Sequence, residues 1–338
     1  GRAGEPGVRR GPRLLGATAP HPPGGGALLE ENGPILAGAA HHRAGTGHAG
    51  ANALRLCAER GLTDRIAAAV VTLEPCNHTG RTPPCAEALL DTPVRTIWIG
   101  CADPNPKVAG GGAARLVSAG RTVRWLEQDS TDIVDQAYLI AQCRGLIAPF
   151  IRWSVTGRSW LTVKQAVNPQ GLMTPPPGRT TFTSQQALRL AHRIRRATDG
   201  VVTAGGTVRC DLPGLDVRHV EDHHNRKPRV LMVCSRTQDV PANWLTIARH
   251  RFNVVFCDSV EDIPRRLAEE NILWAMVEAG PTLLGMLRTA GLWDDWLRIA
   301  VRADGREDFS VERRHEATPL ALFDELLGGI VAGQKELV

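Results

Sequence analysis

Residues 71–85 read Val-Thr-Leu-Glu-Pro-Cys-Asn-His-Thr-Gly-Arg-Thr-Pro-Pro-Cys. The apolar run ending at Leu73 predicts a β-strand, and Cys85 begins a pattern typical of a helix. Cys76 and Cys85 therefore lie at the ends of successive elements, where a helix N-terminus stabilises a thiolate. Upstream, His48 begins another predicted helix. One His and two Cys form a three-ligand zinc site that keeps a fourth position open for water.

Zinc held by one His and two Cys activates water in the nucleobase deaminases. Their chemistry also needs a carboxylate two residues after the His, because a proton must pass from the attacking water to the leaving amine. This chain has Gly50 at that position. The sequence thus predicts an intact zinc site without its proton carrier. The alternative is a chance pair of cysteines near a surface His.

The composition is that of an ordinary globular protein, with 43% hydrophobic and 22% charged residues among 338, enough for two domains. The net charge of +5 suits a phosphorylated substrate. Lys and Arg do not cluster with aromatic residues, so we expect no nucleic-acid partner. No apolar run reaches the roughly 18 residues of a membrane span. The N-terminus shows no apolar signal region, so we expect a cytoplasmic protein with no membrane partner.

Strands alternate with helices along the chain, which predicts two α/β domains, residues 13–146 and 149–338, with a junction at 145–149. In the first domain we expect strands at 27–29, 35–40, 67–73, 95–100 and 123–126, and helices at 49–60, 85–90 and 113–119. In the second we expect strands at 150–155, 160–166, 201–204, 229–234, 253–257, 274–278 and 294–301, and helices at 184–196 and 281–290.

Three motifs carry a resemblance to a known family. They are His41-x-x-Ala-Gly-x-x-His-Ala49, Leu73-Glu-Pro-Cys-x-His-x-Gly-Arg-Thr-Pro-Pro-Cys85 and Asp103-Pro-Asn-Pro-x-Val-x-Gly-x-Gly112. Over roughly residues 15–300 the chain resembles the bifunctional riboflavin-biosynthesis deaminase/reductase family. The long spacing between the cysteines distinguishes this family from deaminases that use the shorter Pro-Cys-x-x-Cys motif.

The resemblance implies a cytidine-deaminase-like three-layer domain followed by a dihydrofolate-reductase-like domain. The first would deaminate a diamino-pyrimidinone ribosylamine phosphate to the uracil, and the second would reduce the ribosyl group to ribityl with NADPH. The implied zinc ligands are His48, Cys76 and Cys85. The implied substrate-binding residues of the first domain are His41, His78, Asp103 and Asn105.

Two departures from the family pattern fall in this pocket. Gly50 stands where the family has its catalytic Glu, and the family turn Asn-Pro-x-Val-Gly appears as His21-Pro-Pro-Gly-Gly25, without the substrate-facing Asn. Losing a general acid/base costs about 10²–10⁴ in rate, so we expect strongly reduced deaminase activity. Glu74 precedes the Pro-Cys pair, and we expect its side chain to point away from the zinc site.

The second half carries the motif Gly205-Gly-Thr-Val-x-x-Asp-x-Pro-x-Leu-x-Val-Arg218, which resembles the same family's reductase domain. Its glycines let the backbone approach cofactor phosphates closely. The implied cofactor-binding residues are Gly205, Gly206, Thr207, Asp211 and Gly280. The implied substrate-binding residues are Lys164, Ser184, Arg195, Arg218 and Glu278. Of these, Arg195 and Arg218 are candidate phosphate partners, because a guanidinium binds phosphate bidentately.

Each assignment in the second half has an ordinary alternative. Lys164 could be a surface residue, Arg195 part of a solvated helix face, and Glu278 a helix-capping carboxylate. Gln170 and Ala279 depart from the family pattern. Three other functions stay open: a reductase with a structural zinc site, a non-catalytic two-domain scaffold, and a nucleic-acid-editing deaminase, which would leave the second domain unexplained. The resemblance also implies a homo-oligomer formed through the reductase domain.

Overall fold

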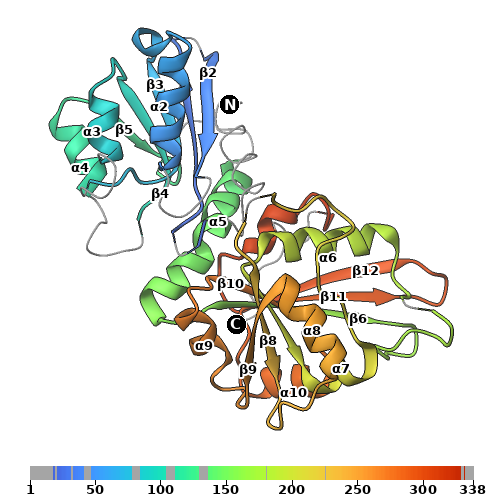
Figure 1. Ribbon diagram of the computed structural model, residues 1–338. Helices are drawn as coiled ribbons and strands as arrows, with labels where there is room; N and C mark the ends of the chain where they lie inside the picture. The colour runs from blue at the N-terminus through green and yellow to red at the C-terminus, as the bar shows by residue number, and fades with distance from the viewer. Residues whose placement is uncertain are drawn as a thin grey trace. The chain divides into compact units, whose positions relative to one another are not determined.

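The computed structural model describes residues 18–19, 21–31, 33–41, 47–77, 84–103, 111–128, 136–179, 181–224, 226–328 and 331. The chain divides into two compact units, residues 1–155 and 156–338 (Figure 1). Each unit has its own sheet, flanked by helices, and this arrangement confirms the predicted α/β class. None of the described helices is both long and apolar enough to cross a bilayer.

The first unit is built on a five-stranded sheet in the order β2-β1-β3-β4-β5. The strands are β1 (Gly25–Leu29), β2 (Ile35–Ala40), β3 (Ala68–Leu73), β4 (Thr96–Cys101) and β5 (Thr122–Trp125). β1 runs antiparallel to β2 and β3, whereas β3, β4 and β5 are parallel. The carboxyl ends of β3 and β4 therefore lie at the same edge of the sheet, where the Glu74-Pro-Cys76 segment begins.

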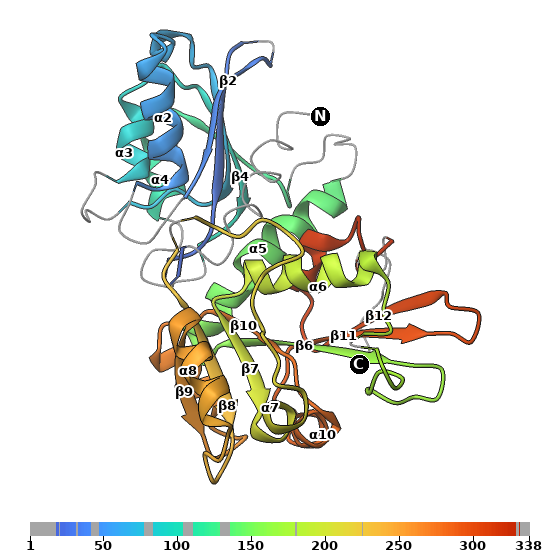
Figure 2. The same ribbon diagram turned by 45° about the vertical axis from the view of Figure 1, so that its right-hand side comes forward.

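Helices pack on both faces of this sheet. The helices α2 (Ala49–Glu59), α3 (Cys85–Leu90) and α4 (Gly111–Ser118) lie together on one side of β2 and β4 (Figure 2). A short turn, η2 (Thr63–Arg65), links α2 to β3. Helix α5 (Gln136–Thr156) packs its Cys143 and Ile147 beside Cys101 in a separate apolar cluster. A Cβ at Gly100 would lie 2.7 Å from Cys143 Sγ, so this approach of α5 to β4 requires glycine.

Helix α5 corrects two predictions. The segment 150–155, predicted as a strand, is helical, and the predicted junction at 145–149 lies inside the same helix. Proline removes one helical hydrogen bond and crowds the preceding turn. Residues 145–149 are nevertheless all buried, Pro149 among them. Burial of this apolar stretch therefore outweighs both the cost of Pro149 and the β preference of the residues that follow.

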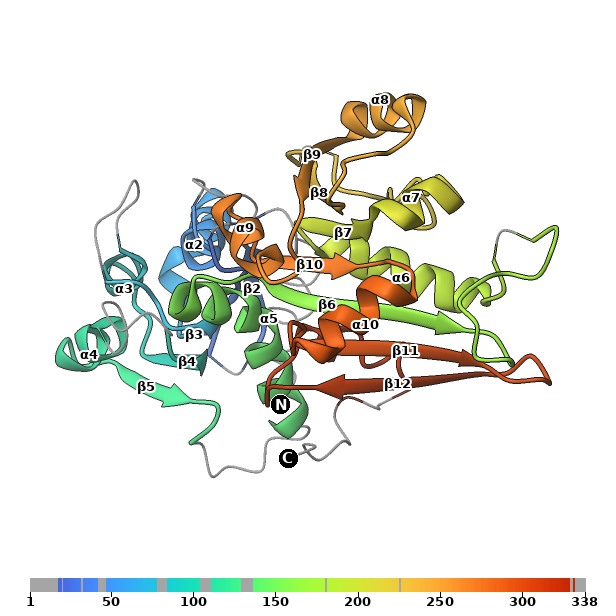
Figure 3. The same cartoon turned by 90° about the horizontal axis from the view of Figure 1, so that it is seen from below.

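The second unit has a seven-stranded sheet in the order β12-β11-β6-β10-β7-β8-β9, in which only β12 runs against its neighbour (Figure 3). The strands are β6 (Trp160–Val167), β7 (Gly200–Ala204), β8 (Arg229–Cys234), β9 (Phe252–Cys257), β10 (Trp274–Val277), β11 (Asp295–Val301) and β12 (Glu307–Arg313). The helices are α6 (Gln185–Ala197), α7 (Gly205–Asp211), α8 (Ala242–Arg251), α9 (Ile263–Glu269), α10 (Pro281–Thr289) and the short η3 (Pro319–Phe323).

The central parallel strands β10, β7 and β8 are buried on both faces, which explains their continuous apolar runs. Val202, Val230 and Met232 pack with the apolar faces of α9 and α10. The alternate residues Val201 and Leu231 pack with α7 and α8 instead. Because successive strand residues point to opposite faces, the unit is a three-layer sandwich. Its central strands β6, β10 and β7 end at an edge that carries the predicted reductase residues.

Candidate functional site

His48, Cys76 and Cys85 come together at one edge of the first sheet. His48 is the N-cap of α2, Cys76 follows β3, and Cys85 is the first residue of α3. His48 Nδ1 lies 3.4 Å from Cys76 Sγ and 3.5 Å from Cys85 Sγ. Zinc bonds of about 2.1 Å to nitrogen and 2.3 Å to sulfur place tetrahedral ligand atoms roughly 3.6 Å apart. The three side chains therefore fit a zinc ion with one position left open.

The electrostatics of the cluster favour a thiolate at Cys76. The Cys85 side chain and the His48 imidazole lower the pKa of the Cys76 thiol to about 4, against the opposing effect of burial. The Cys85 backbone N–H also donates to Cys76 Sγ, at 3.3 Å. Conversely, hydrogen bonding to Cys76 raises the pKa of His48. A thiolate is the form of cysteine that binds metal, so the site is prepared for a cation.

Two further imidazoles lie beside His48, a predicted zinc ligand. The ring of His41 is buried 5.5 Å from the His48 ring, centroid to centroid, and its Nδ1 lies 3.1 Å from the Gly47 carbonyl oxygen. The His21 ring lies 6.4 Å from the His48 ring. His21 therefore stands at the zinc site, in the turn that departs from the family pattern. Of the other predicted pocket residues, His78 and Asn105 lie outside the described residues.

The position of the missing carboxylate is open. Gly50 is the second residue of α2, and among the described residues outside its own helix a Cβ built on it meets no heavy atom within 4 Å. The first turn of α2 contains no acidic residue. Glu74 is buried, and its carboxylate accepts hydrogen bonds from the backbone N–H groups of Asp103 (3.3 Å) and Ala113 (3.0 Å). Its carboxylate thus holds the segment after β4 and the start of α4.

Helix α4 approaches the zinc-binding segment so closely that Gly112 is required. A Cβ on Gly112 would lie 1.7 Å from the Pro75 carbonyl oxygen. We expect Gly112→Ala to displace Pro75 and Cys76, to destabilise the first unit by about 1–3 kcal/mol, and to weaken zinc binding. Urea unfolding and zinc titration check this result. Gly111→Ala is the matched control, because its nearest neighbour would lie 3.7 Å away. Equal behaviour of the two variants would contradict the prediction.

In the second unit, the buried Arg195 and the half-buried Lys164 and Glu278 form a charged group. Lys164 lies on β6, Arg195 on α6, and Glu278 directly follows β10, which pairs with β6. Arg195 Nη2 lies 2.6 Å from Glu278 Oε1, and Lys164 Nζ lies 3.9 Å from Glu278 Oε2. Burial raises the pKa of Glu278, but the charges of Arg195 and Lys164 outweigh it and hold this pKa below its ordinary value.

The predicted cofactor residues lie where two neighbouring parallel strands end. Gly205 and Gly206 begin α7 directly after β7, and Gly280 follows β10. The Gly280 N–H donates to Thr207 Oγ1 at 2.9 Å, which joins the two strand ends. Gly206 is exposed and presents its backbone to solvent, while Asp211 is exposed at the end of α7. The carboxyl edge of a parallel sheet is the usual place for a bound ligand, so this edge suits a dinucleotide.

The remaining predicted residues have different surroundings. Ser184 is the N-cap of α6, where its hydroxyl accepts from the Ala187 N–H and donates to Glu307 Oε2 at 2.5 Å. Arg218 is exposed, and its Nη1 donates to Asp216 Oδ1 at 2.7 Å. The backbone carbonyl of Asp216 accepts from Arg195 Nη1 at 2.5 Å. Ser184 therefore caps the N-terminus of α6, while Arg218 is linked to the Arg195 group through Asp216.

Two residues of this site were missed by the sequence analysis. His192 is buried one turn before Arg195, and its Nδ1 accepts from the Arg218 N–H at 3.0 Å. Asp216 links Arg195, Arg218 and Arg251. The spacing of His192 and Arg195, three residues apart, puts them on one helix face and was the available signal.

Comparison with known proteins identifies both units. Residues 14–101 match the cytidine and deoxycytidylate deaminase zinc-binding region, and residues 159–301 match the RibD C-terminal domain. The riboflavin biosynthesis protein RibD of Mycobacterium tuberculosis is 33% identical over 281 residues, which cover 82% of this chain and 78% of that protein. The chain belongs to the RibD family.

Solved structures agree with this assignment. Acinetobacter baumannii RibD matches with a TM-score of 0.70 and 27% identity, over 89% of this chain and 86% of that one. The diaminohydroxyphosphoribosylaminopyrimidine deaminase/5-amino-6-(5-phosphoribosylamino)uracil reductase of Thermotoga maritima has the same fold, with a TM-score of 0.73 at 24% identity. Membership of the RibD family confirms an enzyme with a deaminase and a reductase domain. The match to a zinc-binding deaminase region, together with the cluster of one His and two Cys, confirms zinc as a cofactor of the first domain.

Proposed function

We propose that this RibD-family chain acts in riboflavin biosynthesis chiefly as an NADPH-dependent reductase. Its substrate would be 5-amino-6-(5-phosphoribosylamino)uracil, whose ribosyl group becomes ribityl. The deaminase step, on the diamino-pyrimidinone precursor, would be strongly impaired although the domain binds zinc. The observation that carries this proposal is a glycine, Gly50, in the place of a carboxylate beside three side chains that could hold a metal ion.

The deaminase domain keeps its metal site and has Gly50 where the proton-carrying carboxylate is needed. Zinc, when bound, supplies an activated water to the substrate ring. The proton of that water must reach the leaving amine. Gly50 has no ionisable side chain and cannot transfer this proton. The Glu74 carboxylate is buried and already accepts two backbone N–H groups, so it is not placed to take over the task. A structural role for the zinc ion fits the same observations.

The reductase domain keeps a charged group suited to its substrate. NADPH, when bound, supplies the hydride. Lys164 and Glu278 place one cation and one carboxylate 3.9 Å apart beside the end of β10, where they can orient ribosyl hydroxyl groups. Arg195 and Arg218 approach the same loop around Asp216 and provide guanidinium groups for the phosphate. Ala279, which departs from the family pattern, is buried. The hydrogen bond from the Gly280 N–H to Thr207 Oγ1 is nevertheless present.

Two assays on one zinc-loaded preparation test the proposal. The first measures ammonia release from the diamino-pyrimidinone ribosylamine phosphate without NADPH. The second measures NADPH oxidation with the deaminated substrate. We expect rapid NADPH oxidation and little ammonia. Ammonia release at an ordinary enzymatic rate would refute the impaired deaminase. No turnover in either assay, together with no NADPH binding, would favour the non-catalytic scaffold.

A further inference from the structure

His192 sits between the helix and the loop that carry the candidate phosphate partners. It lies on α6 one turn before Arg195 and is 2% exposed. Its Nδ1 lies 3.0 Å from the backbone nitrogen of Arg218 and 3.5 Å from that of His219. The His219 ring packs edge-on against it, with centroids 4.6 Å apart. The imidazole therefore fills the space between α6 and residues 218–219.

The hydrogen bonds define the form of His192. Nδ1 lies 3.0 Å from the backbone nitrogen of Arg218, and Nε2 lies 3.4 Å from Arg195 Nη1, so both ring nitrogens face N–H donors. A neutral imidazole accepts at only one nitrogen, and the shorter contact assigns the acceptor to Nδ1. Burial and the charge of Arg195, followed by the nearby His219 and Arg218, lower the pKa of His192 to about 4. A neutral imidazole with an accepting Nδ1 is therefore the form present at neutral pH.

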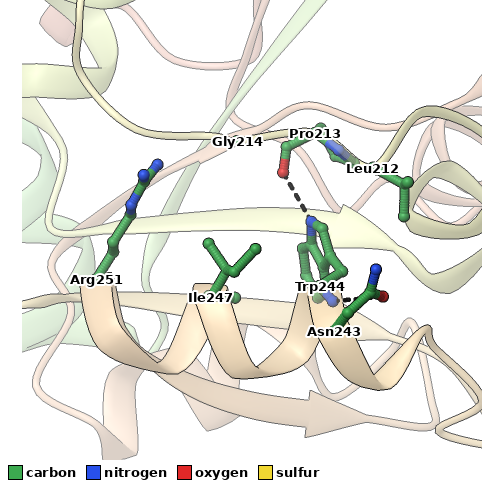
Figure 4. Close-up of a pocket in the computed structure, with 8 residues that line it drawn as sticks. Leu212, Pro213, Gly214, Asn243, Trp244, Ile247 and Arg251 are labelled. Atoms are coloured by element: carbon green, nitrogen blue, oxygen red, sulfur yellow. Dashed lines mark hydrogen bonds between the residues drawn. The ribbon is translucent and has the colours of Figure 1, made fainter.

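The loop that His192 holds is strained. Leu212 and Leu215 have φ angles of 44° and 51°, a region that side chains rarely adopt. A conformation of this kind persists only where surrounding contacts impose it. One such contact is the hydrogen bond from Trp244 Nε1 to the Pro213 carbonyl, 2.9 Å long, at a small pocket between the loop and α8 (Figure 4). The contacts with α6 lie at the other end of the loop.

Two side chains of helix α6 hydrogen-bond the backbone at that end of the loop, residues 216–218. Arg195 Nη1 donates to the Asp216 carbonyl at 2.5 Å, and His192 accepts the Arg218 N–H at 3.0 Å. Arg195 is also fixed by Glu278, so it cannot follow the loop if the loop moves. The His192 contact therefore determines where the Arg218 backbone lies relative to the Arg195 guanidinium.

We propose that His192 is a positioning residue, whose Nδ1 holds the Arg218 backbone so that Arg195 and Arg218 bind the substrate phosphate together. This inference rests on the proposed reductase function. The side chain touches neither substrate nor cofactor in this role, and its effect passes through Arg218. Loss of the acceptor should weaken binding of the phosphate and leave the hydride step largely intact.

Two polar substitutions separate the acceptor from the bulk of the side chain. His192→Asn places an amide oxygen near the position of Nδ1, whereas His192→Gln places it near Nε2. For His192→Gln we expect KM for the phosphorylated substrate to rise about tenfold or more, with kcat and the KM for NADPH little changed. His192→Asn should restore KM to within about threefold of the wild type, the range of a retained neutral hydrogen bond. The same substrate without its phosphate should show no difference between the proteins.

The outcomes are distinguishable from failure of the proposed function. If the wild-type protein does not oxidise NADPH with the uracil substrate, or if Arg218→Leu leaves KM unchanged, the proposed phosphate site itself is wrong. If Arg218→Leu raises KM and His192→Gln does not, the role of His192 is refuted. Equal increases for His192→Asn and His192→Gln would also refute it, as would an equal increase with the dephosphorylated substrate.

Discussion

Gly50→Glu is expected to raise ammonia release by the zinc-loaded protein by about 10²-fold or more. The position lies in the first turn of α2, two residues after His48, and no atom of another described element lies within 4 Å of an added Cβ. A carboxylate can therefore be introduced without displacing the ligands. It would carry the proton from the attacking water to the leaving amine. NADPH oxidation should not change, because the reductase residues belong to the other unit.

Gly50→Gln is the matched control for this variant. A glycine inside a helix is about 0.8–1.0 kcal/mol less favourable than a good helix former. Replacing Gly50 by either Glu or Gln should therefore stabilise the first unit. Only the carboxylate can accept and return a proton. Equal ammonia release by the two variants, or no gain from Glu, would locate the defect elsewhere. The turn that contains His21 would then be the next candidate.

The clustering of His48, Cys76 and Cys85 could be predicted because each residue occupies the end of an element that the sequence marks clearly. His48 caps α2, Cys76 follows the apolar β3, and Cys85 starts α3 after a proline. β3 and β4 are parallel, and α2, α3 and α4 pack in one apolar cluster with them. This topology brings the ends of these elements to one edge of the sheet. The metal site is thus a consequence of local signals and sheet topology.

Contacts that depend on irregular backbone could not be predicted in this way. The loop after α7 contains two leucines with positive φ, and no residue pattern marks leucine for that conformation. The contacts of His192 and Arg195 with this loop follow from its path. In helix α5 a regular element forms where the sequence does not predict one, because packing outweighs a strand-like sequence and the internal Pro149. Local preference fails in both places because tertiary contacts decide the backbone.

Arg195→Leu is expected to lower the free energy of unfolding of the second unit by about 3–5 kcal/mol at neutral pH, because it leaves a buried carboxylate without its closest partner. The side chains of Arg195 and Glu278 are 7% and 13% exposed, and their charged atoms lie 2.6 Å apart. Lys164, at 3.9 Å, is the more distant partner and replaces this contact only in part. Urea unfolding followed by tryptophan fluorescence measures the loss. Arg193→Leu, at an exposed position of the same helix, should cost about 0.5 kcal/mol or less.

The pH dependence of this loss separates charge from packing. In the native protein burial raises the pKa of Glu278, but Arg195 and Lys164 lower it further, so it lies below its ordinary value. A lowered folded pKa contributes stability that is present above the unfolded pKa and is lost as pH falls through the folded value. Without Arg195 burial prevails, the pKa rises, and Glu278 becomes neutral as the solution is acidified. The difference between wild type and Arg195→Leu should therefore shrink from neutral pH to about pH 4, near the unfolded pKa of Glu. If the difference in unfolding free energy does not depend on pH, the cost of Arg195→Leu comes from lost packing. In that case the Arg195→Leu/Glu278→Leu double variant should be no more stable than Arg195→Leu alone.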